Sequence, residues 1–239
     1  VLKKLGVNSP VEIIPNGVEL QLFRNGCQDC HQDFGFKEED ILITYSGRLG
    51  PEKNLDFLIR AFAGTAEAIK NAHLLIIGGG PEEEPLKQLA AQTGVSGRIH
   101  FTGMLPYDEI PRTLSICDIF ATASVTEVHP LSVIEAMATG LPVLGIHSVG
   151  VGDIVEDGVT GLLSSQDQAA FAALLTRLCM DSNLRRNMGL AAQKASDKYA
   201  IEHTTQIMLN RYERLITEFA PHHRGLGYRF RNMVEKLRT

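Results

Sequence analysis

Two carboxylates, Glu127 and Glu135, flank the expected start of a helix in the segment TEVHPLSVIEAMATGLPV, which covers residues 126–143. A proline fits the first turn of that helix and a glycine–proline stop follows it, so the helix is predicted to run roughly over residues 131–139. Its free N–H groups and the positive end of its dipole point toward the loop that carries Glu127. The segment therefore predicts a pocket for an anion, and a sugar diphosphate would suit it.

Glu135 stands one turn further into the predicted helix than Leu131 and on the same face. A carboxylate beside an anion site would repel the phosphate itself, so Glu135 is expected to accept hydrogen bonds from ribose or sugar hydroxyls. A solvated helix position is the alternative. The neighbours Val133, Ile134 and Met137 are apolar, however, and a carboxylate among such residues needs hydrogen-bonding partners.

Four further segments accompany the Glu-x7-Glu spacing of Glu127 and Glu135. In chain order they are IPNGVELQLF (residues 14–23), YSGRLGPEKN (45–54), LLIIGGGPE (74–82) and IHFTGMLP (99–106). Together the five pieces resemble the retaining glycosyltransferases with two Rossmann-like domains, the GT-B fold of glycosyltransferase family 4, also called group 1. The resemblance covers about residues 13–163 and is to the C-terminal, donor-binding domain of such enzymes.

The resemblance implies catalytic and donor-binding roles for four charged residues. Arg48 and Lys53 would bind the diphosphate of the donor, Glu127 would contact the transferred sugar, and Glu135 would bind the ribose. Guanidinium and ammonium groups are natural partners of phosphate oxygens, and they stabilise the charge that grows as the sugar leaves. Exposed loop positions are the alternative for Arg48 and Lys53, and a helix cap is the alternative for Glu127.

The resemblance places further donor contacts in the same loops. They are Gly47, Gly79, Leu105, His129, Leu131 and Ser132. The glycines would let the backbone approach the nucleoside, and the backbone of Leu105 would meet the base. The N–H groups of Leu131 and Ser132 would bind phosphate. His129 and Pro130 replace an aromatic or glycine pair of many relatives, so one contact is expected to be absent because proline has no N–H. His129 is either a sugar contact or a plain loop residue.

The resemblance also sets the expected chemistry. The chain lacks an Asp-x-Asp pair, so no metal and no cofactor is expected, and the donor would be a UDP-sugar first and a GDP-sugar second. A hexosyl group would pass to an acceptor, a lipid or a polysaccharide, with retention of configuration and without a covalent nucleophile. A non-catalytic nucleotide-sugar-binding module and a sugar-nucleotide epimerase of the same architecture are the alternatives.

Short apolar runs alternate with amphipathic helical stretches, which is typical of a parallel sheet covered on both faces. Strands are predicted at residues 11–14, 41–45, 74–77, 99–102, 119–121, 143–146 and 161–163. Helices are predicted at residues 55–69, 83–93, 107–116, 131–139, 151–156, 168–180, 182–198 and 203–219. The pattern predicts an α/β fold with a doubly wound parallel sheet, Rossmann-like, and additional C-terminal helices. Ligands of such sheets lie outside the carboxyl ends of the strands, where the candidate residues fall.

Residues 1–200 are expected to form the nucleotide-sugar-binding domain, and residues 201–239 a terminal helix and a basic tail. The resemblance implies an N-terminal acceptor-binding domain in the complete enzyme, toward which the terminal helix would pack. The chain alone would then bind donor but turn over little. The tail carries five Lys or Arg against one Glu and could contact an anionic membrane surface. A solvated terminal helix is the alternative.

The composition narrows the function classes. A formal net charge of −5 argues against a dedicated nucleic-acid binder, whose phosphate contacts need a basic surface. No apolar run approaches a membrane span, and the first residues lack the apolar core of a secretion signal, so a cytoplasmic setting is expected. The hydrophobic fraction of 44% is enough for a full core.

Cys27, Cys30 and His31 spell Cys-x-x-Cys-His, the sequence used for attaching c-type haem. Haem attachment of that kind requires export, and zinc would need a further ligand, so a loop that contains these residues by chance is the preferred interpretation. Cys117 and Cys179 stand among apolar residues and are predicted to be buried.

Overall fold

The computed structural model describes residues 2–6, 9, 11–24 and 31–219. The chain divides into two compact units, one of residues Val18–Lys198 and one that joins Val1–Gly17 to Tyr199–Thr239. The first seventeen residues therefore group with the C-terminal helix, whereas the expected division placed them with the sheet.

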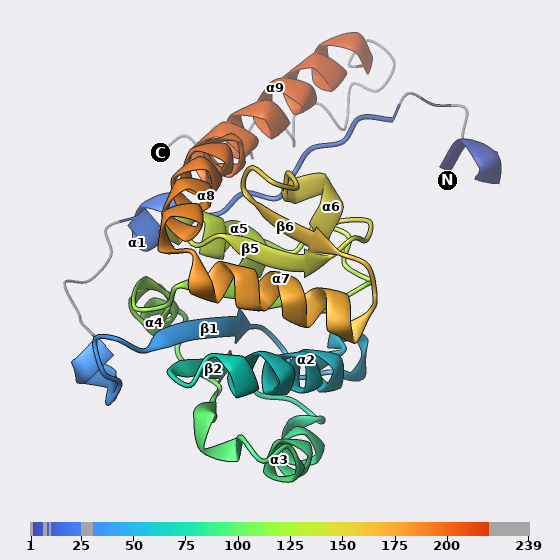
Figure 1. Cartoon of the computed structure of the whole chain (residues 1–239). Coiled ribbons are helices and arrows are strands. Elements are labelled where there is room, and N and C mark those ends of the chain that lie inside the picture. The colour runs from blue at the N-terminus through green and yellow to red at the C-terminus, as the bar shows by residue number, and fades with distance from the viewer. Residues whose placement is uncertain (1, 7–8, 10, 25–30, 220–239) are drawn as a thin grey trace. The chain divides into compact units, whose positions relative to one another are not determined.

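The larger unit is built on one parallel sheet (Figure 1). Its strands in the described residues are β1 (Ile41–Ser46), β2 (Ala72–Ile77), β3 (Ile99–Gly103), β4 (Ile119–Thr122), β5 (Val143–Ile146) and β6 (Gly161–Ser164). They lie in the order β3-β2-β1-β4-β5-β6, which is the Rossmann order. The side chains of β1, β2 and β4 are buried on both faces for most of their length, as the continuous apolar runs predict, whereas those of the edge strand β3 are mostly half-buried. The expected α/β fold class is confirmed.

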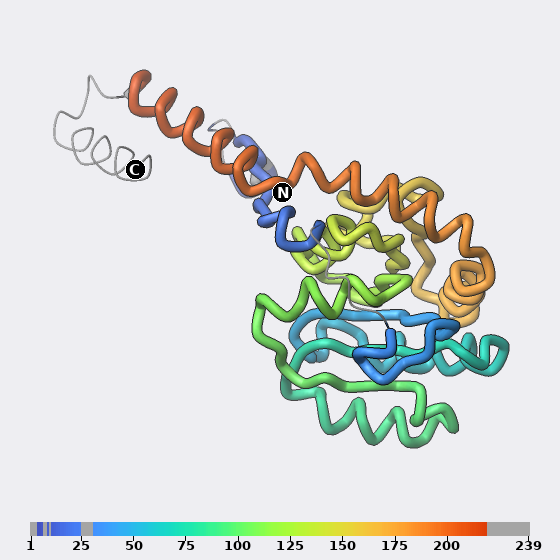
Figure 2. The backbone as a smooth tube through the Cα atoms, turned by 90° about the vertical axis from the view of Figure 1, so that its left-hand side faces the viewer, coloured from blue at the N-terminus to red at the C-terminus, as the bar shows by residue number. Residues whose placement is uncertain are grey.

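Helices cover both faces of the sheet (Figures 1 and 2). Those of the larger unit are α1 (Leu20–Arg24), α2 (Leu55–Ala68), α3 (Glu83–Gln92), α4 (Ile110–Ser115), α5 (Leu131–Thr139), α6 (Val151–Ile154), α7 (Gln168–Met180) and α8 (Ser182–Ala195). Short 3-10 turns occur at His31–Phe34, Pro51–Lys53, Ser96–Arg98, Tyr107–Glu109 and Ser196–Tyr199. In Figure 2, α2 and α7 lie on one side of the strands and α4 and α5 on the other.

The sequence explains where these helices begin and end. The N-cap carboxylates of α7 and α8 accept hydrogen bonds from the first turns, Asp167 from the N–H of Ala170 and Asp181 from that of Leu184, each at 2.8 Å. α5 ends at Gly140, whose φ of 92° is the left-handed conformation that glycine adopts without strain. Both Asp caps and the glycine stop are readable in the sequence, which is why the predicted limits of α5 and α7 match the structure.

The core lies mainly between the sheet and the layer formed by α2, α3 and α7. Phe57 of α2 and Phe171 of α7 meet edge to face with ring centroids 5.5 Å apart. Such a pair is worth about 0.5–1.5 kcal/mol beyond the burial of its area. Cys117 and Cys179 are buried free thiols, as predicted.

The strand predicted at residues 11–14 is wrong, because this segment is extended chain outside the sheet. Ile13 is 92% exposed, so no neighbouring strand or helix covers the segment there. Glu12 instead forms ion pairs with Arg211 and Arg214 of α9 (Ile201–Phe219), the long helix of the smaller unit. Figure 2 shows the segment alongside that helix. An apolar run becomes a strand only where another strand offers its backbone, and here a helix lies alongside.

The sequence did not predict α1. α1 is too short for its periodicity to be recognised, yet it buries Leu20 and Phe23. Cys27, Cys30 and the basic tail of residues 220–239 lie outside the described residues. The ring of His31 contacts two carbonyl oxygens, those of Lys37 at 2.9 Å and Ile116 at 2.8 Å. No helix in the described ranges is long and apolar enough to cross a membrane.

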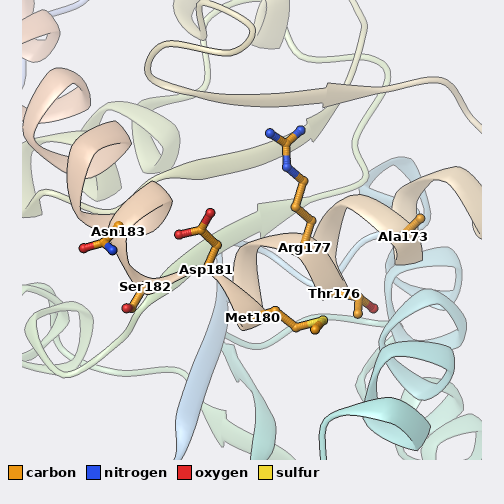
Figure 3. A pocket seen from close by; sticks show the side chains of 7 residues that line it. All are labelled: Ala173, Thr176, Arg177, Met180, Asp181, Ser182 and Asn183. Carbon is orange, nitrogen blue, oxygen red and sulfur yellow. The ribbon is translucent and has the colours of Figure 1, made fainter.

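A shallow pocket opens where α7 meets α8 (Figure 3). Its lining is Ala173, Thr176, Arg177, Met180, Asp181, Ser182 and Asn183. None of the candidate donor residues belongs to this lining, so the pocket is a feature of the helix junction rather than of the expected site.

Two histidines pack together near the amino ends of β2 and β3. The Nδ1 of His73 lies 3.0 Å from the Nε2 of His100, and Phe36 contacts both rings edge on. Burial is the main cause that lowers the pKa of each histidine. For His73, Asp40 opposes the shift while Arg98 and Lys37 reinforce it. For His100, the neighbouring His73 adds to the shift.

We expect the free energy of unfolding to fall as the pH drops from about 7 to about 5. Both histidines bind protons less readily in the folded state than in the unfolded chain, where the pKa is about 6.5. Below that pH the unfolded state carries more protons, so acid favours unfolding. Urea unfolding at a series of pH values measures this dependence. In a His73→Asn/His100→Asn double variant, the free energy of unfolding should fall less steeply with decreasing pH than in the parent. His203→Asn, at an exposed position of α9, is the matched control, and equal slopes in all three proteins would contradict the assignment.

Candidate functional site

The candidate residues converge at the carboxyl ends of β1 and β4, which are neighbours in the sheet. The strand order reverses here: β2 and β3 lie on one side of β1, and β5 and β6 lie on the other side of β4. In doubly wound sheets, ligands bind at such a switch point, outside the carboxyl ends of the strands. The pairing starts at Asp118, whose carboxylate accepts the N–H of Leu42 at 2.9 Å and sets the two strands in register.

The loop after β1 and the loop after β4 are tied together by side chains. Lys53 forms an ion pair with Glu127, and each of these side chains is only about one fifth exposed. Asn54 donates to the carbonyl of Ala123 at 3.2 Å, and Ser124 donates to the carbonyl of Glu52 at 3.3 Å. The structure therefore brings the expected phosphate-binding lysine and the expected sugar-binding glutamate into direct contact.

Arg48 lies in the same loop but faces solvent. Its side chain is 61% exposed, and it pairs with Glu52 at 2.7 Å rather than with Glu127. The hydroxyl of Tyr45 donates to the carbonyl of Arg48 at 3.1 Å and so holds the backbone of the loop. Burial, assisted by Glu127 and Glu52, raises the pKa of Tyr45, which keeps its hydroxyl protonated as a donor. The head group of Arg48 is thus exposed and paired with Glu52, while its backbone is held by Tyr45.

The glycine turn after β2 packs directly on the loop after β1. The N–H of Leu49 donates to the carbonyl of Gly79 at 2.9 Å. Gly78 has a φ of +127°, and a side chain there would collide with the carbonyl oxygen of Gly47. The end of β3 joins the same group, because the N–H of Gly78 donates to the carbonyl of Gly103 at 3.0 Å. Leu105, which is half-buried, follows that strand. Gly47, Gly79 and Leu105 therefore all lie at the carboxyl end of the sheet.

α5 brings its first turn to the same edge. Pro130 is its N-cap, and within the described residues no side-chain hydrogen bond caps the helix there. The N–H groups of Leu131 and Ser132 are among the first-turn donors that have no partner inside a helix. Leu131 is 41% exposed and Ser132 is half-buried. These donors and the positive end of the helix dipole lie where the sequence predicts an anion pocket.

Glu135 is nearly buried, with 7% of its surface exposed. The hydroxyl of Tyr107 donates to its Oε1 at 3.1 Å. Burial raises the pKa of Glu135, and the hydrogen bond from Tyr107 opposes that shift. The apolar neighbours expected from the sequence, Val133, Ile134 and Met137, are fully packed. His129, half-buried, stands between the two glutamates in the chain, and burial lowers its pKa.

Sequence reasoning missed three residues that shape this site. Tyr107 meets Glu135, Asn54 adopts φ 54° and bonds the loop after β4, and Gly150 packs on the backbone of Glu127. The asparagine had a signal in the sequence, because Asn is enriched at left-handed positions. The tyrosine had none, because its partner is 28 positions away in the chain.

The fold is a doubly wound α/β domain, and the candidate residues lie at its topological switch point, between β1 and β4. The sequence matches the family described as "Glycosyl transferases group 1" over residues 28–195, more than half of the chain. The chain belongs to this family of glycosyltransferases, and the expected family and fold are confirmed.

Individual relatives agree with this assignment. The D-inositol 3-phosphate glycosyltransferase of Nocardia farcinica is 30% identical over 226 residues, which cover 91% of this chain and 50% of that protein. The GDP-mannose-dependent alpha-(1-6)-phosphatidylinositol monomannoside mannosyltransferase of Mycolicibacterium smegmatis is 30% identical over 199 residues, 79% of this chain and 52% of that protein. The chain thus spans about half the length of the curated relatives it matches.

Solved structures show the same fold. HepE of Anabaena in complex with UDP aligns with a TM-score of 0.77 at 23% identity, over 85% of this chain and 57% of that one. The same protein was also solved with UDP-glucose.

We expect a Gly78→Ala variant to lose at least about 2 kcal/mol of unfolding free energy, the scale of a backbone conformation that L residues resist combined with a steric clash. The methyl group would collide with Gly47, and φ at this position is positive. Urea unfolding measures the loss. Gly97→Ala is the matched control, because φ there is not positive and a side chain would meet no atom within 4 Å. A loss of similar size in both variants would contradict this account of the glycine turn.

Proposed function

We propose that this chain provides the donor site of a hexosyltransferase that moves a sugar from a nucleotide diphosphate to an acceptor with retention of configuration. The observation that carries the proposal is the meeting of Lys53 and Glu127 at the switch point, beside the first turn of α5. A cation for phosphate, a carboxylate for sugar hydroxyls and a helix N-terminus for anions are the groups that such a donor needs.

Lys53 and Arg48 would hold the diphosphate together with the N–H groups of Leu131 and Ser132. Negative charge grows on the diphosphate as the sugar leaves, so these donors are worth more in the transition state than in the ground state. Lys53 is partly buried and its environment is ordered by the pair with Glu127, whereas Arg48 is exposed. Lys53 is therefore proposed as the stronger contributor.

Glu127 would accept hydrogen bonds from hydroxyl groups of the transferred sugar, and Glu135 would accept them from the ribose hydroxyls. We propose a UDP-sugar as the first candidate donor and a GDP-sugar as the second, without a metal or cofactor. Relatives support both bases: HepE was solved with UDP and UDP-glucose, and the mycobacterial mannosyltransferase is described as GDP-mannose-dependent. Since those relatives are about twice as long, the acceptor would be bound by a further, N-terminal domain.

We expect Lys53→Ala to weaken binding of nucleoside diphosphates and, in a complete enzyme, to slow transfer by about 100-fold or more, the scale for removing one preorganised donor. Arg48→Ala should have the same effect to a smaller extent because its head group is exposed. Calorimetric titration with UDP, GDP, ADP and their hexose conjugates measures binding. Lys70→Ala, an exposed lysine that precedes β2 at the opposite edge, is the control. Unchanged affinity in both site variants would refute the proposed roles.

Glu127→Gln should have opposite effects on the binding of plain nucleoside diphosphates and on the binding of their hexose conjugates. The carboxylate neutralises Lys53 in the free protein and would repel a diphosphate, so its loss should tighten binding of UDP or GDP by about fivefold, near 1 kcal/mol. The hexose conjugates should lose affinity relative to the plain diphosphates, because the acceptor for sugar hydroxyls is gone. Glu67→Gln is the charge-matched control. Glu67 is exposed on α2 and lies far from the site, about 18 Å along the helix from its first residue, Leu55, since an α-helix rises about 1.5 Å per residue. Parallel changes for both ligand types would argue against a sugar contact.

A further inference from the structure

Tyr107 connects two parts of the site that are far apart in the sequence. It opens the 3-10 turn Tyr107–Glu109, directly after Pro106 at the end of the segment that follows β3. Its hydroxyl donates to Oε1 of Glu135 on α5 at 3.1 Å. The turn that would meet the base and the carboxylate that would meet the ribose are therefore joined by one hydrogen bond.

The environment of Glu135 makes this bond consequential. The carboxylate is 7% exposed and stands among packed apolar residues. A carboxylate has about four acceptor positions, so one donor at Oε1 leaves capacity for hydroxyl groups of a ligand. Without a fixed donor, the terminal torsion of a glutamate side chain is broad, and its oxygens take many orientations. A hydrogen bond to one oxygen therefore determines where the other points.

Tyr107 is about half exposed, at 51%, and its ring is oriented by one aromatic contact. Its ring meets the ring of Phe23 edge to face, with centroids 6.1 Å apart and planes at 73°. Phe23 belongs to α1 and is 1% exposed, so it offers a rigid surface. Burial and the charge of Glu135 raise the pKa of Tyr107 to about 12, which leaves its hydroxyl protonated at neutral pH. The tyrosine is thus a fixed donor beside a carboxylate that needs one.

We propose that Tyr107 is a positioning residue for nucleoside recognition, which holds the Glu135 carboxylate in the orientation that accepts the ribose hydroxyls of the donor. The inference rests on the proposed function, because it assumes that Glu135 meets the ribose. It assigns Tyr107 no contact with the reacting atoms. Its consequence is that the tyrosine hydroxyl contributes to affinity only through the ribose hydroxyls.

The test compares ligands that differ only at the ribose. Calorimetric titration of this chain is performed with UDP and GDP and with their 2′,3′-dideoxy forms, for the parent and for Tyr107→Phe. We expect Tyr107→Phe to weaken binding of the ribose forms by about tenfold, the scale of a hydrogen bond to a charged group. The dideoxy forms should bind the two proteins equally, because the contact that the tyrosine supports is absent from them. In a Glu135→Gln background the effect of Tyr107→Phe should likewise shrink toward zero, as a double-mutant cycle requires for a coupled pair.

Tyr45→Phe is the matched control. It removes another tyrosine hydroxyl from the same site, but one that bonds the carbonyl of Arg48. Any loss it causes should therefore be equal for ribose and dideoxy ligands. Thermal unfolding of each variant checks that the fold is retained.

The outcomes separate the inference from the function on which it rests. A loss in Tyr107→Phe that is equal for ribose and dideoxy ligands, or no loss at all, would overturn the positioning role while leaving the donor site intact. If the parent protein bound neither UDP nor GDP, the proposed donors would be overturned, and the inference with them.

Discussion

The site depends on the parallel pairing of β1 with β4. This pairing is where the strand order reverses, and the loops that leave its carboxyl end carry the candidate residues. Asp118 contributes to the pairing by accepting the N–H of Leu42 at the start of β1, and Arg185 of α8 lies 3.5 Å from the same carboxyl group. Every charged residue of the candidate site follows one of these two strands or stands on the helix that comes next.

Charge is balanced within the crevice before any ligand enters it. Lys53 pairs with Glu127, and Arg48 pairs with Glu52. Partly buried charges need such partners, because a lone desolvated cation would be costly. In the proposed donor complex, a diphosphate would compete with these carboxylates for the two cations.

Close backbone approach gives the edge its rigidity. Gly78 lies against Gly47, and Gly150 lies against the backbone of Glu127. A side chain at either glycine would collide with the neighbouring main chain. Main-chain contacts thus join the loop after β1 to the loop after β2, and the loop after β4 to the loop after β5. A loop that is held by its backbone can present polar side chains to a ligand without losing its position.

The sequence by itself determined the elements and the order of the candidate residues. Apolar runs predicted β1 to β6, a proline and a glycine marked the limits of α5, and Lys53 and Glu127 were placed after strands. Only the tertiary structure decided which residues meet. It put residues 11–14 beside α9 instead of in the sheet, and it brought Tyr107 to Glu135 across 28 positions. The physical reason is that caps, turns and hydrophobic periodicity act between residues close in the chain, whereas strand pairing and side-chain contacts depend on which distant segments the fold places side by side.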